Sequence, residues 1–152
     1  MFTKNVQINP SEFYLDRLIK ECEQAISHYS YTKEVFFTFD LPHQGIKADF
    51  ELLNLVIQNF IFNAIDAIEE GEKENGNVSI ALIPDSSQVI LQIMDDGKAI
   101  ENKNILFEPF KITKTKGNGL GLALSLQIIQ AHGGKIDLLE NPKGFAISIP
   151  YM

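Results

Sequence analysis

The sequence predicts an α+β two-layer sandwich, with about three helices on one face of a mixed sheet of about five strands. The main observation is the order of its patterned segments, which runs helix, strand, helix, two strands, a long loop, helix and two strands. The second is the composition of the 152 residues, of which 45% are hydrophobic and 22% are charged. This balance is typical of a globular domain, and the length corresponds to about one domain, residues 1–152.

The first elements are predicted from a helix-start signal and from apolar spacing. Residues 9–12, Asn-Pro-Ser-Glu, combine a capping residue, a proline suited to the first helical position and a glutamate that can reach back. Apolar residues then recur at helical spacing, so we expect a helix over 11–29. A phenylalanine-rich segment over 35–40 predicts a strand that ends before Pro42.

A second helix is expected from a cap at Asp49 to about Glu70. Apolar residues occupy so much of its surface that it should be largely buried. The remaining strands are predicted over 77–83, 88–94, 135–140 and 144–149, and a third helix over 120–131. Turns are predicted at 84–87 and 141–143. Residues 97–119 show no period, and an unpatterned segment of that length is usually functional.

Charge and cysteine content exclude some classes of protein. The chain has 20 acidic and 13 basic residues, and its net charge of −7 argues against non-specific nucleic-acid binding. The lone cysteine, Cys22, cannot form an internal disulfide, which favours a reducing compartment. Residues 1–10 lack the apolar stretch of a signal peptide, and no apolar run approaches about 20 residues. We therefore expect a cytoplasmic domain that itself has no membrane contact, although a longer parent protein could be anchored.

Two asparagines form the first candidate site. Asn59 and Asn63 are four residues apart and share one face of the second predicted helix, and Asp66 follows on the same stripe. Asparagine is a poor helix former, and a buried amide needs a partner. That partner can be neighbouring backbone, or an amide oxygen can face a magnesium–phosphate group, since Mg²⁺ takes few protein ligands.

The second candidate site is Asp95 with Gly97, directly after a predicted strand. A carboxylate there can accept a hydrogen bond from an exocyclic amine such as that of adenine, and a glycine lets a ring approach the backbone. The alternative is an ordinary Asp-Asp-Gly turn. In the long loop, Phe107 and Phe110 precede Lys111 and Lys114; they can be simple anchors of a solvated loop or part of an anion-contacting one.

The fourth segment, residues 117–122, is Gly-Asn-Gly-Leu-Gly-Leu at the start of the third helix. Successive backbone N–H groups at a helix N-terminus make an anion site. The segment does not follow a strand, so it fails the structural context of a dinucleotide-binding fingerprint.

In order and spacing, the four segments together resemble the ATP-binding catalytic domain of two-component sensor histidine kinases. That domain belongs to the superfamily shared with DNA gyrase, Hsp90 and MutL. Residues 59–64 match its N box, 95–99 its first glycine box, 107–114 its F box and 117–122 its second glycine box; residues 131–134, Ala-His-Gly-Gly, match the segment after it. The resemblance covers about residues 10–150.

The resemblance implies a Bergerat-type fold that binds Mg-ATP or ADP and transfers the γ-phosphate to a histidine on a separate dimerisation domain, with a response regulator downstream. It implies that Asn63 holds Mg²⁺ with Asn59 beside it, that Asp95 accepts the adenine amine, and that Gly97 gives the base room. Residues 101–118 would form the ATP lid, in which Lys114 or Lys116 offsets phosphate charge. The other implied nucleotide contacts are Asp66, Ala99, Ile100, Phe107, Thr113, Gly117, Asn118, Gly119, Leu120, Gly121 and Leu122.

The phosphoacceptor is not expected in this chain. The chain has three histidines, His28, His43 and His132. None has the acidic neighbour that the family's substrate histidine carries, so we expect them to be structural or exposed. Three positions depart from the family pattern: Ala99 replaces a glycine, Lys98 stands where proline is common, and Asp66 where a base is frequent.

Two alternatives remain at this point. One is an ATP-hydrolysing clamp of the same superfamily, whose members carry a glutamate where Asn59 stands. Asparagine cannot serve as that base. The other is a nucleotide-binding regulatory module without kinase activity, which the departures at Lys98 and Ala99 leave open.

Overall fold

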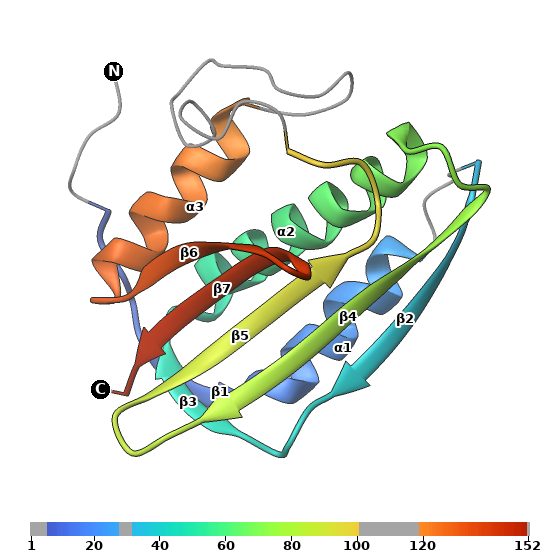
Figure 1. The fold of residues 1–152 in the computed structure, drawn as a ribbon. Helices are drawn as coiled ribbons and strands as arrows, with labels where there is room; N and C mark the ends of the chain where they lie inside the picture. The colour runs from blue at the N-terminus through green and yellow to red at the C-terminus, as the bar shows by residue number, and fades with distance from the viewer. Residues whose placement is uncertain (1–5, 28–31, 101–118, 152) are drawn as a thin grey trace.

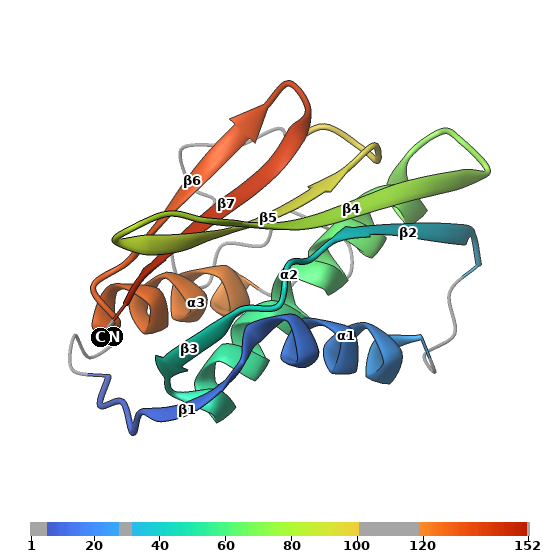
Figure 2. The same cartoon turned by 90° about the horizontal axis from the view of Figure 1, so that it is seen from below.

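Three helices cover one face of a five-stranded sheet in the computed structural model of the chain (Figures 1 and 2). The structure describes residues 6–27, 32–100 and 119–151. In chain order the elements are β1 (Ser11–Tyr14), α1 (Leu15–Ile26), β2 (Glu34–Asp40), β3 (Gly45–Ala48), α2 (Phe50–Glu70), β4 (Asn75–Pro84), β5 (Gln88–Asp95), α3 (Gly119–Ala131), β6 (Lys135–Glu140) and β7 (Lys143–Pro150).

The sheet is mixed, as the sequence predicted. Its strand order is β2-β4-β5-β7-β6. Strand β2 pairs parallel to β4, whereas β4, β5, β7 and β6 pair antiparallel with their neighbours. Figure 2 shows α1, α2 and α3 side by side beneath the sheet. The predicted two-layer sandwich, with five strands and three helices, is confirmed.

The predicted start of the first helix is wrong. Helix α1 begins at Leu15, and residues 11–14 instead form β1, which pairs antiparallel with β3 in a separate two-stranded sheet. The backbone N–H of Asn9 donates to Asp49 Oδ2 (2.7 Å), so this residue contacts the start of α2 instead of capping α1. Both strands of this small sheet are four residues long, too short for alternation to reveal them.

Helix α2 is the centre of the core, as its wide apolar surface predicted. The Asp49 side chain accepts a hydrogen bond from the backbone N–H of Leu52 (3.0 Å), so the predicted cap is present. By length and composition alone, α2 could cross a membrane, and the expectation that no segment approaches such a span is wrong on that measure. Half of its most apolar window is buried inside the fold, as expected of a core helix.

A buried histidine joins the start of α2 to the end of α3. The backbone N–H of Asp49 donates to His132 Nε2 (3.0 Å), and His132 Nδ1 contacts the carbonyl oxygen of Ile128 (2.8 Å). The ring is 4% exposed. Both nitrogens are therefore engaged, and the expected structural role of His132 is confirmed. His43 lies on the surface and pairs with Asp16 (3.1 Å), while His28 lies outside the described residues.

The chain passes very close to α2 after β5 ends. A Cβ atom added at Gly97 would lie 2.3 Å from the backbone carbonyl carbon of Ala67 and 2.4 Å from the backbone nitrogen of Ile68. The next residue, Lys98, donates its backbone N–H to the carbonyl oxygen of Ala67 (2.7 Å). Only glycine fits at position 97, because the neighbour is helix backbone that cannot move aside.

We expect Gly97→Ala to destabilise the fold, because the added methyl group must push the segment after β5 away from α2. Overpacking of this kind costs about 1–3 kcal/mol. Urea unfolding followed by circular dichroism measures the loss. The control is Gly45→Ala, where a Cβ would lie 3.8 Å from the Tyr14 ring, an ordinary contact. Equal stability losses for the two variants would contradict this account of Gly97.

Candidate functional site

A cavity lies between α2, the end of β5 and the start of β7. Its mixed lining, with apolar walls and a few polar groups, is that of a small-molecule site. The lining residues are Phe60, Asn63, Ala64, Ala67, Glu70, Ile93, Asp95, Lys98, Ala99, Ile100, Leu122, Lys143, Gly144 and Phe145. Five of the predicted site residues are therefore brought together here: Asn63, Asp95, Ala99, Ile100 and Leu122.

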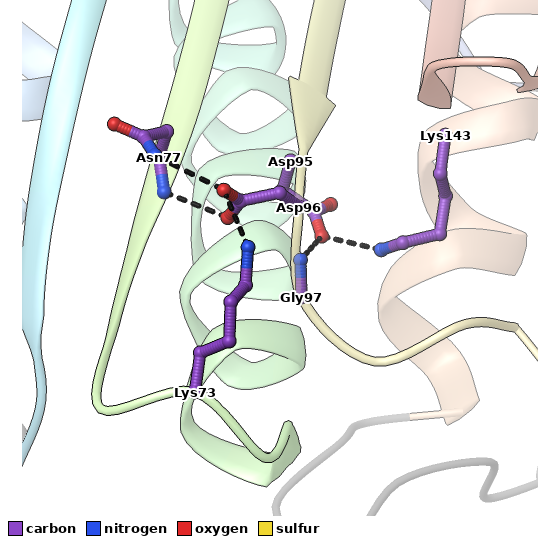
Figure 3. A network of polar contacts seen from close by, with 6 residues as sticks. All are labelled: Lys73, Asn77, Asp95, Asp96, Gly97 and Lys143. Carbon is purple, nitrogen blue, oxygen red and sulfur yellow. Dashed lines mark hydrogen bonds and ion pairs between the residues drawn. The ribbon is translucent and has the colours of Figure 1, made fainter.

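Asp95 is the most firmly held carboxylate in the cavity wall. It ends β5, and its side chain is 9% exposed. Its Oδ1 atom accepts hydrogen bonds from the backbone N–H of Gly97 (2.9 Å) and from Lys143 Nζ, as Figure 3 shows. Both of these donors from the described part of the chain bind Oδ1 and not Oδ2.

Asp96, the neighbouring carboxylate, faces another group of residues and does not line this cavity. It accepts hydrogen bonds from Asn77, through the backbone N–H (2.8 Å) and Nδ2 (3.0 Å), and from Lys73 Nζ (2.9 Å) (Figure 3). Burial alone would raise the pKa of Asp96, but the hydrogen bonds from Asn77 and Lys73 outweigh it and hold the pKa at about 2. Of the two adjacent acids, Asp96 holds the loop after β5 against β4.

The two candidate asparagines of α2, Asn59 and Asn63, have different surroundings. Asn63 lines the cavity. Asn59 Nδ2 instead lies 3.4 Å from the carbonyl oxygen of Gly121 and 3.3 Å from Ser125 Oγ, so it joins α2 to α3. Asp66 lies farther along α2 and is not among the residues that line the cavity. Nucleotide contacts of Asn59 and Asp66 remain predictions.

The glycine-rich segment is described only in part. Helix α3 begins at Gly119, and in its first turns Leu122 lines the cavity while Gly121 lies against Asn59. A Cβ at Gly121 would lie 3.6 Å from the Asn59 side chain, an ordinary contact. The predicted lid, 101–118, lies outside the described residues, with Phe107, Thr113, Lys114, Lys116, Gly117 and Asn118 in it. The side chain of Leu120 is also not described.

Sequence reasoning missed the residues that β7 contributes. Lys143, Gly144 and Phe145 line the cavity, and the Phe145 ring packs edge-on against Phe60 with centroids 4.9 Å apart. Lys143 was assigned only to a turn, and nothing in its own neighbourhood marks it. The signal would have been the register of β5 with β7, which cannot be read from either strand alone. Glu70 was also missed, and its Oε2 atom is buried without a hydrogen-bond partner in the described structure.

The donor set can suit a magnesium ion only if the ligand supplies most of the coordination. Among the described residues, no three His, Cys, Asp or Glu side chains are grouped to hold a metal. Asn63, whose side chain carries one amide oxygen, lines the cavity. Mg²⁺ commonly takes one or two protein ligands and completes its shell with water and substrate phosphates, so this set fits that mode.

The low pKa of Asp96 predicts an acid-sensitive contribution to stability. The pKa is about 2 in the folded chain and about 3.9 for an unperturbed aspartate. The contribution is therefore fully present above about pH 4 and is lost as the pH falls through about 2. Asp96→Asn should flatten the decline of the free energy of unfolding over this range, measured by urea titrations at several pH values. Asp137→Asn, at an exposed acid paired with Lys135 (3.5 Å), is the control; an unchanged slope in Asp96→Asn would contradict the assignment.

Comparison with known proteins now identifies the family. The family model described as "Histidine kinase-, DNA gyrase B-, and HSP90-like ATPase" matches residues 48–151. The sensor histidine kinase FlgS of Helicobacter pylori is 46% identical over 151 residues, which cover 98% of this chain and 40% of that protein. Sporulation kinase A of Bacillus subtilis is 37% identical over 142 residues, covering 90% of this chain and 23% of that protein.

Solved structures agree with the sequence relatives. The catalytic domain of histidine kinase ThkA superposes with a TM-score of 0.80 at 30% identity, covering 95% of this chain and 99% of that chain. ThkA in complex with response regulator protein TrrA superposes with a TM-score of 0.76 at 28% identity, covering 94% of this chain and 42% of that chain.

The chain spans about two fifths of the length of FlgS and about a quarter of sporulation kinase A, so it corresponds to one part of these longer proteins. The matched part is the ATP-binding one, and its fold is that of the ThkA catalytic domain. The relatives of this chain are sensor histidine kinases, and the chain corresponds to their catalytic domain. The chain therefore belongs to the histidine kinase-, DNA gyrase B- and HSP90-like ATPase family.

Proposed function

We propose that this chain binds Mg-ATP in the cavity between α2, β5 and β7 and transfers the γ-phosphate to a histidine on a separate dimerisation domain. The phosphoryl group then passes to a response regulator, the kind of protein that is bound to ThkA in the related complex. A cytoplasmic location goes with this proposal, because both ATP and the response regulator are found there. The observation that carries the proposal is Asp95, a nearly buried carboxylate held by Gly97 in the wall of an otherwise largely apolar cavity.

In this proposal, the adenine base occupies the apolar part of the cavity. Phe60, Ile93 and Phe145 offer it apolar surface, and burial of a flat ring there contributes through the hydrophobic effect. The exocyclic amine donates to Asp95. A hydrogen bond to a charged group is stronger than a neutral one and requires a matching donor, so it selects the base as well as binding it. Ala99 and Ile100 lie at the same wall, so the alanine in place of a glycine adds one methyl group to it.

The phosphates are proposed to extend from the base toward the N-terminal end of α3. The first backbone N–H groups of a helix have no partner within the helix and suit an anion. Asn63 is proposed to hold Mg²⁺ through its amide oxygen, and the ion supplies neutralisation of phosphate charge. The lid residues Phe107, Thr113, Lys114, Lys116, Gly117 and Asn118 complete the proposed site by resemblance alone, as do Asn59 and Asp66.

The transfer step needs positioning more than acid–base chemistry from this domain. An imidazole nitrogen of the incoming histidine forms a bond to the γ-phosphorus while the bond from that phosphorus to the β–γ bridging oxygen breaks, and ADP leaves. The electron pair comes from the imidazole, so this chain need not supply a nucleophile. His132 is not a candidate acceptor, because both of its nitrogens are engaged in the core.

The structure disfavours the hydrolysing alternative. A clamp that hydrolyses ATP needs a base near water at position 59, and Asn59 is an amide directed at Gly121 and Ser125 of α3. A purely regulatory nucleotide-binding module shares the base-binding step with the kinase. The two differ only in phosphoryl transfer, which the second experiment below measures.

The first test concerns the base. Losing a hydrogen bond to a charged group costs about 1.5–3 kcal/mol, so Asp95→Asn should weaken ADP binding by about tenfold to a hundredfold. Isothermal titration calorimetry at neutral pH measures it. Asp96→Asn is a closely matched control, because the adjacent acid bonds to Asn77 and Lys73 away from the cavity. Unchanged ADP affinity in Asp95→Asn would remove Asp95 from the site.

The second test concerns transfer. With labelled ATP, the chain alone should neither label itself nor release phosphate quickly. No histidine of the chain has the sequence context of a phosphoacceptor, and Asn59 cannot serve as the base that typically accelerates attack by water about 10²–10⁴-fold. Adding a helical hairpin with a phosphoacceptor histidine should give acid-labile, base-stable label on the hairpin. Asn63→Ala should abolish this label while leaving magnesium-free ADP binding largely intact.

Two results would contradict the kinase assignment. Absence of label on any hairpin from a sensor histidine kinase, despite ADP binding, would favour the regulatory module. Rapid phosphate release by the chain alone that disappears in Asn59→Ala would favour the hydrolysing clamp.

A further inference from the structure

Lys143 occupies a position directly across from Asp95. Strand β7 pairs antiparallel with β5 up to Met94 opposite Gly144, and one further step in the same register places residue 143 opposite residue 95. On its other side, Lys143 is paired with Glu140 of β6. Residues directly opposite in a sheet point to the same face. The lysine side chain therefore starts on the cavity side of the sheet, between two acidic residues.

The ion pair between Lys143 and Asp95 is unusually sheltered for a lysine. Lys143 Nζ donates to Asp95 Oδ1, and the two side chains are only 16% and 9% exposed (Figure 3). Two other lysine–aspartate pairs in the described structure are open: Lys73 with Asp96 is 60% and 36% exposed, and Lys135 with Asp137 is 69% and 55% exposed. Sheltering two charges costs desolvation energy that their attraction often does no more than offset, so stability alone is a weak reason for this pair.

Close packing of the backbone at Gly144 places Lys143 near Asp95. A Cβ atom at Gly144 would lie 2.4 Å from the carbonyl oxygen of Ile93 and 2.7 Å from the Cα of Met94. A glycine at this position lets the start of β7 lie directly against the end of β5. Because Lys143 is the next residue, its side chain begins close to the carboxylate that it contacts.

We propose that Lys143 is a positioning residue that orients the Asp95 carboxylate for a purine with an exocyclic amine. This inference rests on the proposed function. Gly97 and Lys143 both donate to Oδ1, so the carboxylate is held from two sides and its Oδ2 atom is the one presented to a ligand donor. A group that is oriented before binding loses less freedom when the ligand arrives, which improves affinity. Lys143 thus contributes to selection of the base through Asp95.

The experiment compares two ligands that differ at the proposed contact. ADP carries an amine at position 6 of the purine, whereas inosine diphosphate carries a carbonyl oxygen there. If Lys143 acts through Asp95 on the amine, Lys143→Met should weaken ADP binding by about fivefold, the size expected for coupled contacting groups. Binding of inosine diphosphate should stay within about twofold of the wild-type value. Isothermal titration calorimetry measures both.

Two further variants separate positioning from a general effect. Lys143→Arg keeps a cationic donor beside Asp95 and should restore most of the ADP affinity. In an Asp95→Asn background, Lys143→Met should cause no further loss, because the group it acts on is gone. Lys135→Met removes the same charge from an exposed lysine on the neighbouring strand β6 and should leave both affinities unchanged. Urea unfolding of each variant verifies that it is folded.

The possible outcomes are distinct. Equal weakening of both ligands by Lys143→Met would mean that the lysine acts on the phosphates or on the fold, and would overturn the inference. Tighter ADP binding in Lys143→Met would also overturn it, because the lysine would then compete with the base for Asp95. If the wild-type chain binds neither nucleotide, the proposed function itself fails; if it binds ADP but shows neither the ligand difference nor the arginine rescue, only the inference about Lys143 fails.

Discussion

The contact of the chain after β5 with the C-terminal part of α2 is the constraint on which the rest of the site depends. Gly97 lies against the backbone of Ala67, and Lys98 donates its N–H to the same residue. This contact fixes the direction in which the chain leaves the sheet. Asp95 consequently remains in the cavity wall, while Asp96 is directed to Asn77 and Lys73. The adjacent aspartates Asp95 and Asp96 thus have different roles. The cause is the close approach of the chain to the backbone of α2, which only a glycine at position 97 allows.

The two helices that flank the cavity are fixed by polar contacts in the core. Asn59 links α2 to the first turns of α3, and His132 links the end of α3 to the start of α2. Together these contacts hold α3 at both ends, so the N-terminal end of α3 has a defined place beside the cavity. Catalysis that relies on positioning needs such rigid support for the groups that contact the substrate.

Much of the fold could be predicted from the sequence, because helix α2 and the five strands of the main sheet have long, periodic apolar patterns. The start of α1 could not, since residues 9–12 satisfy the local helix-start rules but residues 11–14 pair with a strand more than thirty positions away. Asp95, Asn63 and Leu122 were found through motifs, and they do line the cavity. Lys143 was not found, because its importance comes from strand register alone, and the lid residues remain predictions.

The central claim is that Asp95, at the end of β5, accepts a hydrogen bond from the exocyclic amine of the base. A crystal structure of the chain with ADP and Mg²⁺ tests it most directly. The account predicts that the base lies in the cavity lined by Phe60 and Phe145, with its exocyclic amine within hydrogen-bond distance of Asp95 Oδ2 and with Gly97 and Lys143 still bound to Oδ1. A base bound elsewhere, or an amine that makes no contact with Asp95, would contradict it.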